Sequence, residues 1–533
     1  MRSSNPIFIR FCRSELRLRK SIFWYLLTFA VSAFSLAIIY IPQVVRDRDP
    51  VEAARSALLP LLVIQGVILL FMGTGSVASG ITREKVEKVL DYQRLTPLPV
   101  RRKITGYLFG LPVREYLLFF ITLPSTAFVL VLGEIPPAAF IPYYLVFLSS
   151  TLLYHFTGMV AGMISRRWRW SARISQGLII LLYFVLPQLS HLGLVFFEFL
   201  TVRPVFAEHI LPIIQPGSTL QPDNSGFMAG QSVPIFATMV SGTLFSLVTQ
   251  TLLIALFAWI VARKWRADSV PAISKPMAAA TFLIFSIMSL ANIWPNLTRS
   301  ENALSLFQSD GEVPQKVAVF FLPLILATVT TALSLILMVS ALPDPIQYRH
   351  GRIRAGRTAR GRLAAWDDCA PGYLLALFFI LIQVLLLLVA LATLSQAGYF
   401  TKLASSPLDG IVLILASSLV ILYFQGLKET FGSGQLGLFA LLHGIVPILL
   451  AILVFAITNS LQGPALFLAA ASPVALIPLS ATLLLPPEQF EENLLHLHRA
   501  LGSGLLILGF LAAGLHGRLY LLRKRERGNP EED

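Results

Sequence analysis

Charged residues are scarce in this chain. Only 13% of its 533 residues are Asp, Glu, Lys or Arg, whereas about a quarter is usual for soluble proteins. Hydrophobic residues make up 56% of the chain, and its mean hydropathy is +0.73. So little charge cannot cover the surfaces of several soluble domains. The composition therefore predicts that most of the chain lies in a lipid bilayer.

Residues that commonly carry chemistry are also few. Cys12 and Cys369 are the only cysteines, too few for a disulfide framework or a zinc site. The phosphate-binding sequence G-x-x-x-x-G-K-[ST] is absent, so the chain has no P-loop ATPase site of its own. No loop carries a His and carboxylate cluster with metal-ligand spacing or a Ser, His and Asp constellation. We therefore predict a protein that is not an enzyme and that has no metal and no cofactor.

Long apolar runs make up most of the sequence. A helix needs about 20 apolar residues to cross a bilayer, and helices satisfy their own backbone hydrogen bonds there. The first eight runs cover residues 21–42, 57–79, 107–132, 138–164, 176–199, 235–262, 277–295 and 316–342. The first of them is too long for the apolar part of a cleaved signal peptide. The fold class expected is an all-α polytopic membrane protein.

Lys and Arg residues gather in every second loop between these runs. If the N-terminus is cytoplasmic, the inside loops carry several times as many basic residues as the outside loops. This is the positive-inside distribution of membrane proteins. It accounts for the net charge of +14 and makes membrane lipid, rather than nucleic acid, the expected partner of the basic residues.

Five more apolar runs follow, at residues 372–397, 409–427, 436–458, 465–485 and 503–522. Five crossings would place the basic residues 523–527 outside, against the positive-inside rule. One run must therefore not cross. Prolines interrupt residues 465–485, so we predict an external re-entrant segment there. This gives about 12 transmembrane helices and a cytoplasmic C-terminus.

The 12 predicted helices fall into two six-helix halves that form a parallel pseudo-repeat. In each half a basic cytoplasmic loop follows the second helix and a Pro-rich external re-entrant segment, near 205–230 or 464–487, precedes the sixth. The expected organisation is a cytoplasmic amphipathic segment at 1–20, a first half at 21–262, a second half at 263–522 and a cytoplasmic tail at 523–533. We call residues 80–106 the first basic loop and residues 343–371 the second basic loop.

The first basic loop has the most structured polar sequence of the chain, and we expect a short helix in it. Thr82 is the predicted N-cap, with Glu84 in the first turn. Val86, Val89 and Leu90 form one apolar stripe, and residues 96–99 (TPLP) end the helix. By itself, such a basic amphipathic helix is typical of one that lies on the membrane surface.

In its context the segment resembles the type-2 ABC exporter permeases, the membrane-spanning subunits of ATP-driven exporters. A basic amphipathic segment, two crossings, an Arg-Glu pair, a short helix, a Pro and a basic patch carry the resemblance. It implies a coupling helix that docks on a separate ATPase subunit, in two copies, through Arg83, Glu84, Glu87 and Arg94. It also implies a bacterial cytoplasmic (inner) membrane. Val86 and Glu87 depart from the family pattern, and the second basic loop lacks its acidic pair.

Ionisable residues inside the apolar runs point to an alternative. These possible intramembrane polar sites are His155, His191, Glu198 and His443. Such residues are costly in a membrane and often mark proton relays. A proton-coupled secondary transporter is therefore the second hypothesis, although a membrane His often only bonds a neighbouring helix. A membrane-embedded enzyme or scaffold without a visible site is the third.

Overall fold

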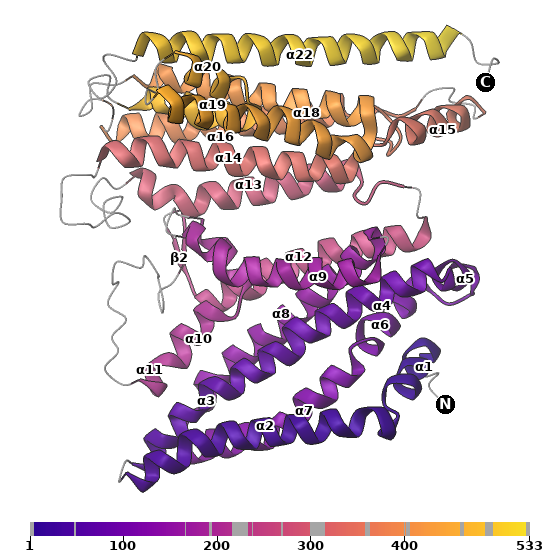
Figure 1. The fold of residues 1–533 in the computed structure, drawn as a ribbon, viewed down its shortest axis with the longest axis vertical. Coiled ribbons are helices and arrows are strands. Elements are labelled where there is room, and N and C mark those ends of the chain that lie inside the picture. The colour runs from indigo at the N-terminus through magenta and orange to yellow at the C-terminus, as the bar shows by residue number, and fades with distance from the viewer. Residues whose placement is uncertain are drawn as a thin grey trace. The chain divides into compact units, whose positions relative to one another are not determined.

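The chain is mostly helical in the computed structural model (Figure 1). The structure describes residues 5–46, 49–165, 167–190, 194–215, 233–236, 238–267, 270–298, 315–357, 363–398, 400, 406–458, 463–485 and 494–528. The chain divides into two compact units. Unit 1 comprises Met1–Val233 with Thr238–Asp268, and unit 2 comprises Pro234–Ala237 with Ser269–Asp533.

Unit 1 contains the elements coloured from indigo to magenta in Figure 1. Its α-helices are α1 (Pro6–Glu15), α2 (Leu18–Val45), α3 (Pro50–Gly66), α4 (Thr74–Val86), α5 (Val89–Leu95), α6 (Val100–Gly110), α7 (Val113–Leu132), α8 (Pro137–Ile164), α9 (Trp168–Ile180), α10 (Arg203–His209), α11 (Leu211–Ile214) and α12 (Gly242–Arg266). Its π- and 3₁₀-turns are η1 (Val67–Gly73), η2 (Leu181–Val185), η3 (Leu186–Ser190) and η4 (Val195–Leu200). A two-stranded hairpin precedes α12. Its strand β2 (Thr238–Val240) belongs to unit 1, whereas Pro234 and Ile235 of β1 (Val233–Ile235) are assigned to unit 2.

Unit 2 is also mostly helical. Its elements are α13 (Lys275–Thr298), α14 (Gln315–Ala341), α15 (Pro345–Gly356), α16 (Tyr373–Gln396), η6 (Pro407–Asp409), α18 (Gly410–Phe439), η7 (Ala440–Ile445), α19 (Val446–Thr458), α20 (Pro464–Ala470), α21 (Pro473–Ala481), η8 (Thr482–Leu484) and α22 (Leu494–Gly528).

Ten helical stretches of the described residues are long and apolar enough to cross a membrane. They are Ser21–Val45, Pro50–Val86, Val113–Leu132, Pro137–Ile164, Gly242–Arg266, Lys275–Thr298, Phe320–Ala341, Tyr373–Gln396, Pro407–Ile457 and Leu494–Lys524. The architecture is that of a multi-pass helical membrane protein, as the composition predicts.

The stretch Pro50–Val86 forms one rod from α3, the π-turn η1 and α4. The Asp49 side chain accepts a hydrogen bond from the Val51 amide and caps the start of the rod. At 1.5 Å per residue its 37 residues extend roughly 55 Å, well beyond an apolar bilayer core of about 30 Å. The rod ends where Lys88 adopts the left-handed region, with φ 58°. The rod is therefore longer than one crossing of the apolar layer requires.

Small residues let α4 pack closely against α8. A Cβ atom added to Gly158 would lie 2.9 Å from the Thr74 carbonyl oxygen, and one added to Gly162 would lie 2.8 Å from that of Ala78. Thr82 is buried in the same contact and donates its hydroxyl to the Ala78 and Gly162 carbonyls. The predicted N-cap at Thr82 is therefore wrong, because the membrane helix continues past it. The short helix is α5.

The fifth apolar run, residues 176–199, does not form one straight helix as predicted. After α9 the chain passes through the π-turn η2 and the 3₁₀-turns η3 and η4. Pro187 within η3 has no amide hydrogen, so it cannot continue a regular helix. Of the predicted external stretch near 205–230, the structure describes α10 and α11, whereas residues 216–232 lie outside the described residues.

Two departures from straight helices mark unit 2. Gly432 interrupts the long helix α18 with φ 72° and ψ 179°, a conformation that suits glycine. The Pro-rich segment forms the pair Pro464–Ala470 and Pro473–Leu484, which bend by 112°. Ser472 lies at that bend, where its hydroxyl accepts from two amides of α21 and donates to the Gly444 carbonyl over 2.6 Å.

Candidate functional site

The end of α4 presents an exposed ion pair. The Arg83 Nε donates to Glu87 Oε1 over 2.9 Å, one helical turn apart. The two side chains are 72% and 52% exposed. Both charged groups are therefore accessible to a partner.

Glu84, between them in the sequence, points into the protein. Its side chain is only 13% exposed and accepts hydrogen bonds from Arg10 of α1 and from the Tyr107 hydroxyl of α6. Burial, followed by the neighbouring Glu84 charge, raises the pKa of Tyr107, so its hydroxyl stays protonated and donates. Ile7 and Phe11 of α1 are buried in the same cluster as Tyr107. Glu84 thus joins α1, α4 and α6.

Arg94 also has an internal role. It donates to Asp91 Oδ1 over 2.5 Å and to the carbonyls of Lys264 and Trp265 at the end of α12 over 3.1 and 3.3 Å. Lys103 of α6 donates to the Gln93 carbonyl of α5 and to the Thr96 carbonyl at its end, and burial lowers the pKa of Lys103. These bonds fix α5 against α6 and α12.

Apolar side chains are exposed where α4 turns into α5. Val86 is 58%, Tyr92 70% and Leu95 85% exposed, whereas Leu90 is buried. We call Arg83, Val86, Glu87, Tyr92 and Leu95 the α4–α5 tip. No pattern in the sequence distinguishes Tyr92 and Leu95 from the other apolar residues of the loop. The predicted apolar stripe of Val86, Val89 and Leu90 requires one continuous helix. The helix breaks at Lys88 instead, and Val86 points outward.

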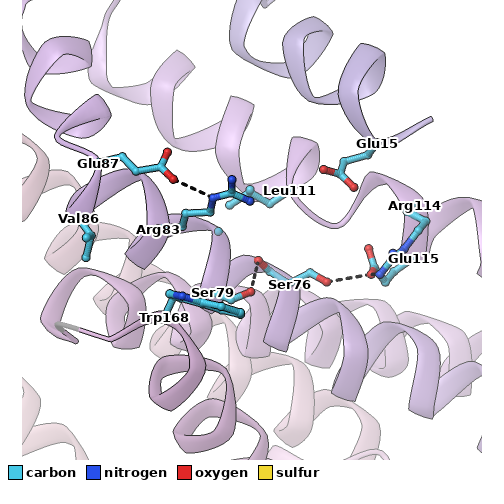
Figure 2. Close-up of a pocket in the computed structure, with 11 residues that line it drawn as sticks. Glu15, Ser76, Ser79, Arg83, Val86, Glu87, Leu111, Arg114, Glu115 and Trp168 are labelled. Carbon is cyan, nitrogen blue, oxygen red and sulfur yellow. Dashed lines mark hydrogen bonds and ion pairs between the residues drawn. The ribbon is translucent and has the colours of Figure 1, made fainter. Parts of the chain in front are cut away.

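A groove of about 650 Å³ opens beside the tip (Figure 2). Its buried floor is Glu115, which accepts hydrogen bonds from Ser76 over 2.8 Å and from Arg114 over 2.7 Å. The groove is lined by Glu15, Ser76, Ser79, Gly80, Arg83, Val86, Glu87, Leu111, Arg114, Glu115 and Trp168. It therefore combines paired charges, serine hydroxyls and one indole, and it lies along the α4 side of the tip.

The second basic loop is held by a different set of charges. Asp344 caps α15 and accepts from Lys428 Nζ over 2.5 Å and from the Ser433 amide over 2.8 Å. Burial acts to raise the pKa of Asp344, but these hydrogen bonds and the Lys428 charge hold it below its usual value. Glu429, which follows Lys428 in α18, accepts hydrogen bonds from the Gly372 amide over 2.5 Å and from Arg523. Lys428 and Glu429 are each only 3% exposed.

Two of the predicted intramembrane histidines bond to neighbouring helices. His155 is buried, with Nδ1 3.0 Å from the Tyr116 hydroxyl and Nε2 3.1 Å from the Leu69 carbonyl oxygen. His443 Nδ1 pairs with the Tyr423 hydroxyl. His191 lies outside the described residues. His155 belongs to unit 1 and His443 to unit 2.

Glu198 is the exception among these groups. It is 4% exposed in η4, and its Oε1 atom has no hydrogen-bond partner. A buried carboxyl oxygen without a partner is costly and calls for a functional account. As for metals, no group of three or more His, Cys, Asp or Glu side chains in the described residues could hold an ion.

Comparison with protein-family models, curated proteins and solved structures gives no match to this chain. Function must therefore be argued from the residues and their geometry.

Proposed function

We propose that this chain is the membrane-spanning permease of a bacterial ABC-type exporter in the cytoplasmic (inner) membrane. ATP would be hydrolysed by a separate ATPase, bound as two copies. The α4–α5 tip carries the proposal, because it presents exposed Tyr92 and Leu95 beside the exposed Arg83–Glu87 pair. Large exposed apolar and aromatic side chains with a polar rim are typical of protein interfaces.

The way the tip is held also supports docking. Glu84 ties it to α1 and α6, and Arg94 ties it to the end of α12. Below it, α4 continues into the rod Pro50–Val86. A protein that binds a rigid tip can transmit a displacement to the helices connected to it, whereas a mobile loop would absorb that displacement.

Twelve crossings remain our interpretation of the membrane topology. The stretch Pro407–Ile457 has 51 residues, and as one straight helix it would extend roughly 75 Å, more than twice the bilayer core. Its break at Gly432 supports two crossings there. The broken segment from α9 to η4 supplies another, and the 112° bend between α20 and α21 suits a re-entrant segment.

A matching polar contact supports the pseudo-repeat. In unit 1, Gln65 of α3 donates to Thr126 of α7 over 2.9 Å. In unit 2, Gln383 of α16 donates to Thr331 of α14, also over 2.9 Å. Each contact joins the second and third predicted crossings of its half. The glutamine lies on the second crossing in the first half and on the third crossing in the second half.

The experiment is an affinity purification of the full chain from native membranes in mild detergent. We expect a P-loop ATPase to co-purify with the wild type and to be lost from the double variant Tyr92→Ala and Leu95→Ala. Both substituted side chains are exposed, so thermal stability should be unchanged. The matched control is Val45→Ala with Val131→Ala, two exposed apolar residues elsewhere in unit 1, which should retain the ATPase.

Equal recovery of the ATPase by the wild type and the tip variant would contradict docking at the tip. Absence of the ATPase from every wild-type preparation would contradict the exporter function itself. Glu84 is unsuitable for this test. Its charge is buried against Arg10 and Tyr107, so a reversal there disturbs the fold of unit 1.

Glu198 favours a second candidate function, a proton-coupled secondary transporter. Its unpartnered Oε1 is the kind of buried acid that proton relays use. Transport that a protonophore abolishes and vanadate leaves intact, and that Glu198→Gln eliminates, would favour this candidate over the exporter. Vanadate-sensitive transport that survives Glu198→Gln would exclude it.

A further inference from the structure

The first two turns of α9 carry an exposed cluster of arginine and tryptophan. The Arg169 Cζ lies 5.1 Å from the centroid of the Trp168 ring, and the Arg173 Cζ lies 5.7 Å from that of Trp170. The two indoles are 49% and 54% exposed. We call Arg167, Trp168, Arg169, Trp170 and Arg173 the α9 patch.

The charge of the α9 patch is not balanced locally. The sequence contains no Asp or Glu between Glu134 and Glu198. In the part of the chain that the structure describes, no ion pair involves Arg167, Arg169 or Arg173. Other arginines, such as Arg10 and Arg523, pair with buried carboxylates. The positive charge of the patch is therefore complementary to an anionic ligand.

An apolar surface continues from the patch along the same helix. Ile174, Leu178 and Leu181 are at least 39% exposed, and Phe184 of η2 is 72% exposed. The opposite side of α9 is buried: Ser171 donates to the Ala78 carbonyl of α4 over 3.1 Å, and Ser175 donates to the Ser171 carbonyl. An anionic site at one end of an exposed apolar strip matches an amphiphile with an anionic head.

We propose that the α9 patch binds the phosphate of an anionic phospholipid, with the acyl chains along the exposed apolar strip of α9. Guanidinium groups match phosphate oxygens in geometry. Indole rings are enriched at the level of lipid headgroups. Because Arg169 and Arg173 are one turn apart, they lie on the same face of α9 and can contact one phosphate together. This inference does not depend on the proposed exporter function.

Binding there has a consequence for α4. Because α9 is hydrogen-bonded to α4 through Ser171, a lipid that holds α9 in place also supports the rod that ends at the α4–α5 tip. Trp168 belongs both to the patch and to the lining of the groove beside the tip. The lipid would therefore lie next to the groove that Figure 2 shows.

The test is lipid binding to the purified full chain, measured by native mass spectrometry. Phosphatidylglycerol is the anionic probe and phosphatidylcholine the zwitterionic one. We expect tighter binding of phosphatidylglycerol to the wild type. Each arginine near an anionic headgroup contributes about 1 kcal/mol, roughly fivefold in affinity. The triple variant Arg167→Gln, Arg169→Gln and Arg173→Gln should therefore lose at least about tenfold, with phosphatidylcholine binding unchanged.

The matched control removes the same charge elsewhere, at three exposed arginines dispersed over α1, α6 and α12: Arg13→Gln, Arg101→Gln and Arg266→Gln. It should bind phosphatidylglycerol like the wild type. An equal loss in this control, or no preference of the wild type for phosphatidylglycerol, would overturn the proposal. Arg173→Gln alone, expected to lose about fivefold, replaces the triple variant if the latter is unstable.

Discussion

The two basic loops use similar side chains in opposite ways. In the first, the Arg83–Glu87 pair lies at the surface beside exposed Tyr92 and Leu95. Asp344 of the second pairs instead with Lys428 of α18, and the neighbouring Glu429 pairs with Arg523 of α22. Lys428 and Glu429 are both almost fully buried. An exposed pair contributes little to stability, whereas a buried pair becomes costly when one partner is removed. The first loop is suited to meet a partner, and the second to hold unit 2 together.

The largest effect is expected from Glu429→Ala. The substitution leaves Arg523 without its buried carboxylate and the Gly372 amide without its acceptor. Breaking a buried pair in this way costs about 3–5 kcal/mol. Thermal unfolding in detergent should show a large drop in the midpoint temperature. A drop no larger than that of an exposed surface substitution would mean that the second basic loop does not depend on this network.

A smaller effect is expected from Glu84→Ala in the first loop. It removes the acceptor of both Arg10 and Tyr107, and hydrogen bonds to charged groups contribute about 1.5–3 kcal/mol. The loss should appear as faster proteolysis near α1 together with a lower midpoint of thermal unfolding. Glu84→Gln, which can still accept a hydrogen bond, should recover part of the stability. If Ala and Gln behave alike, the bonds to Glu84 do not hold α1.

The smallest effect on stability is expected from Glu87→Ala. Its pair with Arg83 is exposed to solvent, so the midpoint temperature of thermal unfolding should stay close to that of the wild type. Binding of the partner should nevertheless weaken if the α4–α5 tip is its docking site. A stability loss comparable to that of Glu84→Ala would remove the distinction drawn between these two neighbouring acids.

Much of the helical architecture could be predicted from the sequence because apolar runs and the bilayer thickness set it. The runs near 21, 57, 107, 138 and 235 all correspond to candidate spans of unit 1. The fifth run could not be predicted in detail. Its hydropathy is continuous, and composition does not distinguish a straight helix from the sequence of π- and 3₁₀-turns that forms there.

Within the first basic loop, the sequence indicates which residues are charged but not which way they point. Glu84 and Glu87 lie three residues apart and look equivalent. They differ because α1 folds back onto α6 and places Arg10 beside Glu84, a contact between residues 74 positions apart. The predicted N-cap at Thr82 is wrong because a Thr before an acidic turn resembles a helix start. In the structure Thr82 packs closely against Gly162, and α4 continues past it.

The π-turn η1 sets the rotational register of α4. A π-turn accommodates an extra residue within a helix, and each residue of an α-helix corresponds to about 100° of rotation. If η1 lost or gained one residue, everything from Thr74 onward would turn by that angle. The Glu84 side chain would then point about 100° away from its present direction, and it would lose its hydrogen bonds from Arg10 and Tyr107. The bond from His155 to the Leu69 carbonyl lies inside η1. The hydrogen bond from His155 therefore helps to hold the π-turn that sets the direction of Glu84, 15 residues further along the chain.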